Sequence, residues 1–190
     1  LKHRQYDKHD NLRIMIPRSV VIATDYFDEF IRNNGLKYII SQEFSDEEIL
    51  SEFVSSTIPV KLQRELKAYI KTVSTPLAVR SSSKLEDSHY QPFAGIYSTY
   101  MIPYTDNEDQ MLRLLLKAVK SVYASVYFAS SRAYLSSSQN LISEEKMAVI
   151  IQEVCGTEQN GLFFPTFSGV ARSINYYPIG DEALSLIHIS

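Results

Sequence analysis

The sequence has little cysteine, no tryptophan and no long apolar run. One cysteine, Cys155, cannot form an internal disulfide, so we expect a reducing compartment, the cytoplasm. No stretch approaches the roughly 20 apolar residues that span a bilayer, so no membrane partner is expected. Positive charge is not in excess either: the formal net charge is -3 over 190 residues. This balance gives no electrostatic reason to expect a nucleic-acid partner.

Signatures of metal and nucleophilic chemistry are also missing. The four histidines are scattered without the spacing of metal ligands: His3, His9, His89 and His188. No Walker A loop, G-x-S-x-G elbow or H-E-x-x-H helix occurs. We therefore predict no metal ligands within this chain.

Helical patterns first, then strand and helical patterns mixed, indicate an α+β or α/β fold, and of these we predict α+β. Helices are expected from Thr24 as a cap, from a Ser45–Glu48 capping box and after Pro59. A long, largely buried helix follows a cap at Thr105 or Asp106, and is expected to break within 130–134. The expected strands are Val20–Ala23, Leu77–Val79, Ile96–Met101, Lys146–Val154 and Ser168–Tyr177, with a hairpin-like connection at Gly161–Pro165. This order indicates N-terminal helices followed by a mostly antiparallel sheet.

The stretch Pro76–Pro103 concentrates groups that suit phosphate. Arg80 follows a short apolar strand and precedes three serines, Ser81–Ser83. A guanidinium matches phosphate oxygens bidentately, and successive backbone N–H groups add an anion nest. Gly95 permits close approach of a ligand to the backbone, and Thr99, four residues on, is expected on the same sheet face. The alternative is an ordinary surface loop whose serines cap their own backbone.

Two further polar residues are candidates for binding. Gln152 is an amide in a strand that otherwise reads as fully buried, and a buried amide needs partners. These partners are either neighbouring backbone groups or a ligand. Arg132 follows the long helix and either binds an acidic or phosphate group or interacts with the helix dipole.

Taken together and in order, these segments resemble one known domain. The run AVRSSSKLED…FAGIYSTY, the segment MAVIIQEV and the later SGVARSINYYP resemble three of its motifs, and IPRSVVIATDYFDEFI resembles its first strand–helix unit. The domain is the N-terminal, ATP-grasp-type nucleotide-binding domain of phosphoenolpyruvate synthase and pyruvate phosphate dikinase. The resemblance covers roughly residues 14 to 178 and is shared by rifampicin phosphotransferase, so it leaves the acceptor open.

The resemblance implies an enzyme of the ATP-dependent phosphotransferase class. Such a domain holds ATP and Mg2+ and passes a phosphoryl group to a histidine on a separate domain, which carries it to pyruvate or another acceptor. By matching position, Arg80 is implied as the phosphate-contacting, catalytic arginine, and Gly95, Thr99 and Gln152 as nucleotide-binding residues. Arg132 matches an arginine after the long helix.

Parts of the family pattern have no match in this chain. The glycine-rich opening with its ATP-binding lysine should precede residue 14, and the acidic Mg2+ ligands should follow residue 178. We therefore interpret 1–13 as a lead-in, 14–178 as a partial nucleotide-binding domain and 179–190 as an unplaced tail. The expectation is a fragment, truncated at both ends and inactive alone. The alternative is a non-catalytic nucleotide-binding or regulatory module.

Overall fold

The computed structural model describes residues 16–40, 42–83, 97–137, 145–171 and 187–189. Contacts divide the chain into two units, Leu1–Val154 and Cys155–Ser190. The first unit contains β1 (Ser19–Ile22), α1 (Thr24–Asn33), the 3-10 helix η1 (Leu36–Ile40), α2 (Asp46–Ser55), α3 (Val60–Ile70), β2 (Leu77–Ser83), β3 (Tyr100–Ile102), α4 (Glu108–Ser125), α5 (Ala129–Ser137) and β4 (Met147–Glu153). The predicted lead-in 1–13, Gly95 and tail residues 179–186 and 190 lie outside the described residues.

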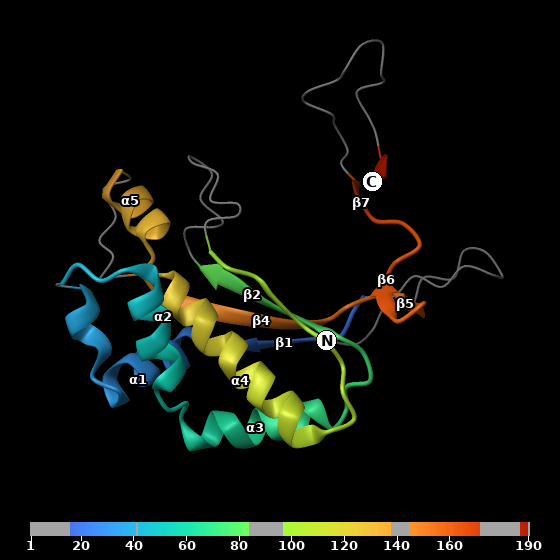
Figure 1. The fold of residues 1–190 in the computed structure, drawn as a ribbon, viewed down its shortest axis with the longest axis horizontal. Coiled ribbons are helices and arrows are strands. Elements are labelled where there is room, and N and C mark those ends of the chain that lie inside the picture. Colours follow the sequence, from blue (N-terminus) through green and yellow to red (C-terminus); the bar gives the residue numbers. More distant parts are fainter. Residues whose placement is uncertain (1–15, 41, 84–96, 138–144, 172–186, 190) are drawn as a thin grey trace, which may run out of the picture. The chain divides into compact units, whose positions relative to one another are not determined.

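The first unit is built on a four-stranded sheet with the order β1-β4-β2-β3 (Figure 1). All three strand pairs are antiparallel, and β2 and β4 are the two central strands. The structure thus confirms the α+β class and the antiparallel sheet that the sequence predicts.

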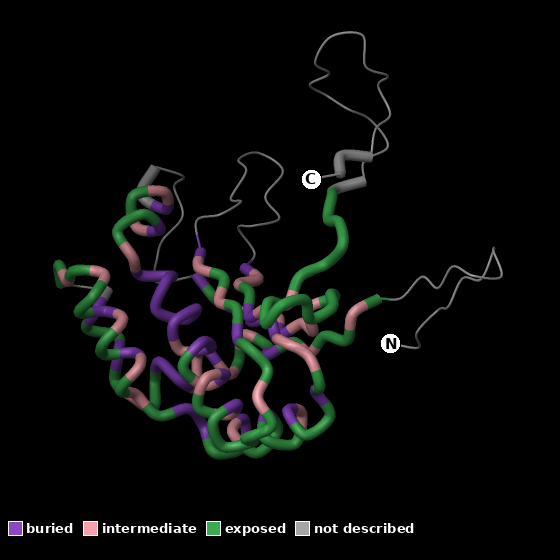
Figure 2. The backbone as a smooth tube through the Cα atoms, turned by 45° about the vertical axis from the view of Figure 1, so that its right-hand side comes forward, coloured by how far each residue is buried: buried purple, intermediate pink, exposed green. Residues whose placement is uncertain are grey.

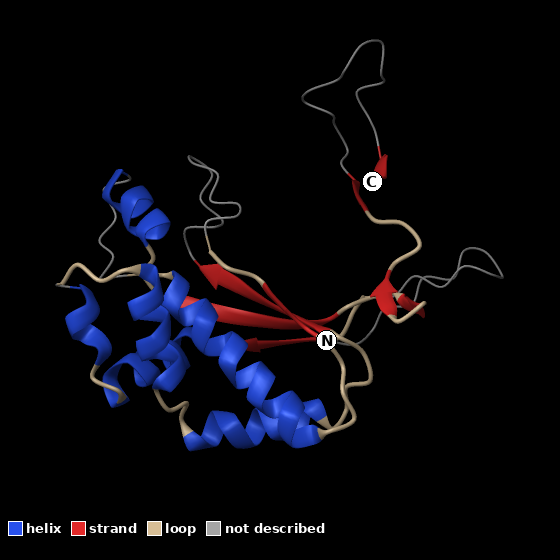
Figure 3. Cartoon of the chain, viewed as in Figure 1, coloured by secondary structure: helices blue, strands red, loops and turns tan. Residues whose placement is uncertain are grey.

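The core lies between this sheet and the helices, which gather on one side of it (Figure 3). Strand residues at alternate positions are fully buried there, including Leu77 and Val79 of β2 and Val149 and Ile151 of β4. Helix α4 supplies a matching apolar stripe that is also fully buried: Leu115, Val119, Val122 and Tyr123. Figure 2 shows the same buried trace through α4 and the strands. Burial of such side chains contributes about 1.5–3 kcal/mol each.

Helix caps agree with the sequence in one case and differ in two. Ser45 and Glu48 form the predicted capping box: Glu48 N donates to Ser45 Oγ at 3.2 Å, and Ser45 N donates to Glu48 Oε2 at 2.8 Å. Helix α1 begins at Thr24 itself, so the prediction of a Thr24 cap is wrong. Helix α4 is capped by Asn107, whose Oδ1 accepts from Gln110 N at 3.0 Å, and not by Thr105 or Asp106.

The predicted break within 130–134 is also wrong, because α5 spans that segment. Helix α4 ends earlier, at Ser125, and α5 begins at Ala129. Two contacts stabilise the turn between them: Ser131 Oγ donates to Ser125 O at 2.6 Å, and Ala129 N donates to Asp46 Oδ1 at 2.7 Å. Side-chain oxygens of this kind offer the backbone an alternative to helical continuation.

The edge strand β3 is shorter than the predicted strand Ile96–Met101. Its three residues pair with Leu77–Val79, whereas Ser98 N donates to Ser125 Oγ at 3.4 Å, away from the sheet. Strand β2, in contrast, is longer than predicted, because β4 continues to pair with it through Ser83.

The second unit contains two short antiparallel pairs. Strands β5 (Thr157–Gln159) and β6 (Leu162–Phe164) form a hairpin, and β7 (Gly169–Ala171) pairs with β8 (Ile187–Ile189). The hairpin turn is Asn160–Gly161, with φ values of 53° and 78°. Positive φ at both positions is the geometry that Asn-Gly favours in two-residue turns. The hairpin is therefore present, with its turn earlier than the predicted Gly161–Pro165 connection.

Helices long and apolar enough to cross a bilayer are absent from the described part of the chain.

Candidate functional site

The sheet face opposite the helices carries the polar residues singled out from the sequence. Paired residues of antiparallel strands point to the same face, and strand residues alternate between faces. With Leu77 and Val79 buried against the helices, Arg80 points to the opposite side, together with its partner Ile150. We call this side the outer face, defined by Ser19, Val21, Ala78, Arg80, Ser82, Met101, Ala148, Ile150 and Gln152.

Arg80 and Gln152 lie on this outer face as diagonal neighbours on the two central strands. Gln152 pairs with Ala78, and Arg80 pairs with Ile150. Along β4, Gln152 therefore lies two residues from the residue directly opposite Arg80. Such diagonal positions lie about 7–8 Å apart. A guanidinium and a carboxamide at this separation can contact two different parts of one ligand of nucleotide size.

The three serines after Arg80 do not act as one group. Because β2 runs to Ser83, the serines alternate: Ser82 shares the outer face with Arg80, whereas Ser83 is buried. The structure therefore contradicts both the anion nest predicted at Ser81–Ser83 and the alternative of a surface loop there. Three identical serines carry no period-two alternation in the sequence, and a run of serines is typical of loops rather than strands.

Gln152 of β4 is half-buried. The apolar run predicts a strand that is covered on both faces, but β4 is covered on one face only. The burial of β4 alternates: Met147, Val149 and Ile151 are buried, while the intervening residues are partly exposed. Apolar residues on the outer face of β4, Ala148 and Ile150, hide this alternation in the sequence. An accessible amide can donate and accept hydrogen bonds to a ligand.

Thr99 is exposed and directly precedes β3. The next residue, Tyr100, pairs with Val79, so the chain at Thr99 enters the sheet beside the strand that carries Arg80. Whether Thr99 shares a face with Gly95 stays a prediction, because Gly95 lies outside the described residues.

Arg132 belongs to α5 and does not lie on the sheet. One of its terminal nitrogens, Nη2, donates to Phe44 O at 2.9 Å, just before the N-terminus of α2. The described contact of Arg132 therefore joins α5 to α2. Its nucleotide-binding role stays a prediction from the family resemblance.

An ion pair lies where β4 leaves the sheet. Arg18 Nη2 lies 2.8 Å from Glu153 Oε1 and also donates to Thr72 O at 2.9 Å. Burial, with a smaller effect from Glu153, raises the pKa of the nearby Tyr69 to about 12. The Arg18 guanidinium stabilises the Glu153 carboxylate, whose side chain is 13% exposed. The end of β4, next to Gln152, is thereby held in place.

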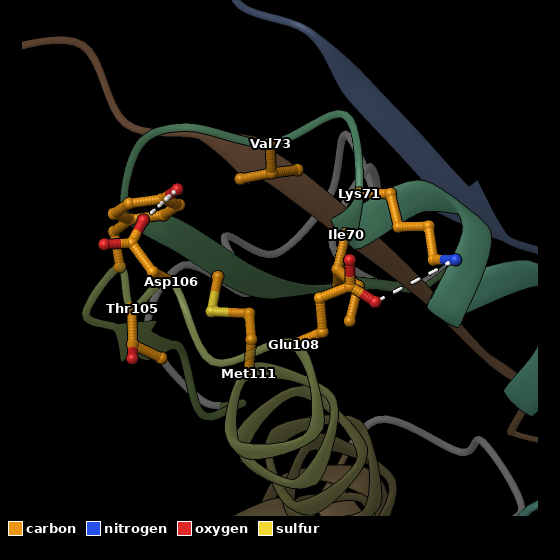
Figure 4. A pocket seen from close by; sticks show the side chains of 8 residues that line it. Ile70, Lys71, Val73, Thr105, Asp106, Glu108 and Met111 are labelled. Atoms are coloured by element: carbon orange, nitrogen blue, oxygen red, sulfur yellow. Dashed lines mark hydrogen bonds and ion pairs between the residues drawn. The ribbon is translucent and has the colours of Figure 1, made fainter.

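A small cavity of about 110 Å³ lies on the helix side, between the end of α3 and the start of α4 (Figure 4). Its rim carries an ion pair of 3.9 Å between Lys71 and Glu108, and the Tyr104 hydroxyl donates to Asp106 at 2.9 Å. The hydrogen bond to Asp106 raises the pKa of Tyr104. Neither Arg80 nor Gln152 lines this cavity, so it is separate from the outer face.

Metal ligands are not grouped in the described residues: no three His, Cys, Asp or Glu side chains there come together as a possible metal site. The residues present on the outer face therefore do not fit a Mg2+ centre by themselves.

The fold is an α+β domain, and its outer face carries an exposed cation, Arg80, and a half-buried amide, Gln152, which suit a phosphorylated ligand. Comparison with known families agrees with this class. The chain belongs to the family of the pyruvate phosphate dikinase AMP/ATP-binding domain, whose model matches residues 6–189. This confirms the resemblance noted in the sequence, and the match extends beyond residues 14 to 178 on both sides.

Similar proteins have related names. The chain is 31% identical over 157 residues to the uncharacterized phosphotransferase YvkC of Bacillus subtilis, covering 78% of this chain and 17% of that protein. It is 27% identical over 172 residues to the phosphoenolpyruvate synthase of Aeropyrum pernix, covering 80% of the chain and 20% of the relative. A probable phosphoenolpyruvate synthase of Staphylothermus marinus is 24% identical over 201 residues, with 93% and 22% covered. The chain thus spans about a fifth of the length of the curated relatives that it matches.

Proposed function

We propose that this chain is the ATP-binding part of a dikinase-type phosphotransferase that resembles phosphoenolpyruvate synthase. The observation that carries the proposal is the pair Arg80 and Gln152 on one sheet face, in a chain of an AMP/ATP-binding domain family. The antiparallel sheet with helices on one side is compatible with an ATP-grasp-type architecture, which we propose as the finer fold class.

In this proposal the outer face binds the nucleotide. Arg80 stabilises negative charge on the transferring phosphoryl group, where a fixed cation has its largest effect. Gln152 and Thr99 position the nucleotide, and Gly95 permits close approach of the chain. Arg132 contributes a further contact to the nucleotide from α5, in line with its match to the family pattern.

Mg2+ is expected with ATP, because metal ions neutralise charge on phosphates during phosphoryl transfer. No three potential ligands group as a metal site in the described residues, and we propose that the Mg2+ ligands lie outside this chain. The phosphoryl group is proposed to pass to a histidine on a separate domain of the whole protein. That domain then delivers it to pyruvate or, as in rifampicin-type phosphotransferases, to another acceptor, in the cytoplasm.

Replacing Arg80 in the intact protein tests the role of the outer face. We expect Arg80→Ala to lower ATP-dependent phosphorylation of the acceptor histidine at least about 100-fold, as loss of one charge-stabilising group at a transition state does. The measurement is the rate of label transfer from radioactive ATP into acid-labile phosphohistidine.

Arg113→Ala is the matched control, because Arg113 is an exposed arginine on α4. This variant should retain the wild-type rate. If Arg80→Ala also retained that rate while folded, the proposed role of Arg80 would be wrong. An intact wild-type protein that binds ATP but never labels a histidine would favour the alternative of a non-catalytic nucleotide-binding module.

A further inference from the structure

A buried polar pair that the proposed function does not use lies near the starts of two strands. Glu145 comes just before β4 and Tyr97 just before β3, and they are only 7% and 5% exposed. The Tyr97 hydroxyl donates to Glu145 Oε1 at 3.3 Å. A buried carboxylate costs free energy that an apolar side chain would not, and what it supplies is a directional hydrogen bond. The pair therefore fixes Tyr97 in one orientation.

A second buried contact holds the residue that follows Tyr97. Ser98 N donates to Ser125 Oγ at 3.4 Å. Ser125 is fully buried at the C-terminal end of α4, and its hydroxyl donates to Val122 O at 2.7 Å. A hydroxyl that donates within its own helix keeps its lone pairs for an incoming N–H group. Both residues of the segment that leads into β3 are thus tied to the core.

Thr99 is the next residue, and the chain is held on both sides of it. Thr99 is exposed, so packing of its own side chain does not fix its place. Before it lie Tyr97 and Ser98 with their buried contacts. After it lies Tyr100, which pairs with Val79 of β2. The backbone at Thr99 therefore runs between two anchored points.

We infer that Tyr97, Glu145 and Ser125 are positioning residues that hold Thr99 where it contacts the nucleotide. They act through the backbone of the segment 97–100 and need no contact with the ligand. Binding groups have to be held within about 0.5 Å of their productive place, and supporting hydrogen bonds supply this precision. The inference rests on the proposed function, because it takes Thr99 as a nucleotide-binding residue.

The test uses the intact protein and the ATP-dependent labelling of its acceptor histidine. Tyr97→Phe keeps the ring and removes only the group that donates to Glu145. We expect this variant to raise the KM for ATP about three- to tenfold, the effect of one hydrogen bond, and to leave kcat within about twofold. A merely structural loss of stability would instead reduce the amount of folded enzyme, which lowers kcat and leaves KM unchanged.

A double-mutant cycle determines whether Tyr97 acts through Thr99. Thr99→Ala alone should raise the KM for ATP. Adding Tyr97→Phe to Thr99→Ala should then change the KM by less than about twofold, because residues that act as a unit are not additive. Should Tyr97→Phe fail to fold, Ser125→Ala takes its place in the cycle, since it removes the oxygen to which Ser98 N donates.

Tyr26→Phe is the matched control. The Tyr26 hydroxyl also donates to a glutamate, Glu65 Oε2, at 2.9 Å, but this hydrogen bond joins α1 to α3. The substitution removes the same chemical group and should retain the wild-type KM for ATP.

Each outcome decides one question. An unchanged KM in folded Tyr97→Phe, or in Ser125→Ala where the first variant is unfolded, overturns the inference while the proposed function stands. An equal rise in KM with and without Thr99→Ala also overturns it, because the contact then acts elsewhere. A wild-type KM in Thr99→Ala overturns it too, and removes only Thr99 from the proposed site. An intact wild-type protein that binds no ATP overturns the proposed function, and the inference with it.

Discussion

At the scale of single residues, polar side chains on the two sides of the sheet differ in exposure. Arg80 and Gln152 are accessible on the outer face, whereas Tyr123 is fully buried among aromatic rings on the helix side. Its ring lies 5.0 Å from that of Phe27 and 5.5 Å from that of Phe30. Burial raises the pKa of the Tyr123 hydroxyl, so this group stays neutral at any physiological pH.

The Tyr123 hydroxyl also has no hydrogen-bond partner among the described residues. An unpaired buried hydroxyl costs about 1–3 kcal/mol relative to its solvated state. We therefore expect Tyr123→Phe to keep the ring contacts and to leave the free energy of unfolding equal or higher by about 1 kcal/mol. Tyr123→Ala should lower the free energy of unfolding by about 3–5 kcal/mol, because the substitution leaves a cavity.

Urea unfolding of the two variants at neutral pH checks this prediction. Loss of more than about 1 kcal/mol in Tyr123→Phe would contradict it, since such a loss is the size of one hydrogen bond.

At the scale of elements, side chains from neighbouring segments decide where helices begin and end. The capping box of α2 is local: Ser45 and Glu48 are three residues apart. The start of α5 is not local, because Asp46 at the N-terminus of α2 accepts from Ala129 N. Lys120 of α4 donates to Val54 O and Ser56 O at the C-terminal end of α2, which joins these two helices.

The α2 capping box predicts a pH dependence of stability. The hydrogen bond from Ser45 N lowers the pKa of Glu48 from its ordinary value of 4.5. A lowered folded-state pKa means that the ionised carboxylate stabilises the folded state above pH 4.5, and that this stabilisation disappears as the pH falls through the lowered pKa. The melting temperature of Glu48→Gln should therefore be lower than that of the wild type at neutral pH. This difference in melting temperature should vanish in acid.

Thermal melts from neutral to acidic pH measure this difference. Glu47→Gln is the control, since it removes a charge from the same helix turn but not the capping hydrogen bond. Its effect should be smaller at every pH. A melting difference for Glu48→Gln that grew as the pH fell would contradict the assignment.

At the scale of the whole molecule, the chain is a family domain whose relatives are about five times longer. We propose that the acceptor histidine and the Mg2+ ligands lie outside this chain. We expect the 190-residue chain alone to bind ATP with Mg2+ at least about tenfold more weakly than the intact protein. It should form no phosphohistidine.

Calorimetry and an acid-labile phosphate assay, run on both proteins side by side, measure these two expectations. Phosphohistidine formation by the chain alone would contradict the proposal that the acceptor lies on a separate domain. Affinity equal to that of the intact protein would place all nucleotide contacts within this chain.

Local chemistry in the sequence determined the α+β class, the Ser45 cap and the core stripes. It also indicated a hairpin near Gly161, whose turn the structure places at Asn160–Gly161, earlier than predicted. These follow from residues within a few positions of one another, where spacing sets which side chains meet. The ordered motifs also identified the family, because they match over much of the chain.

The tertiary structure alone decided which residues share a face. Strand pairing extended β2 through Ser83, so alternation buried one serine and turned Ser82 and Arg80 outward. Pairing with β4 also set Gln152 diagonally from Arg80, and set Ala78 between Gln152 and Met101. The register between β2 and β4, which lie some 70 residues apart in the sequence, depends on which side chains are buried in the folded protein. A local sequence pattern does not contain this information.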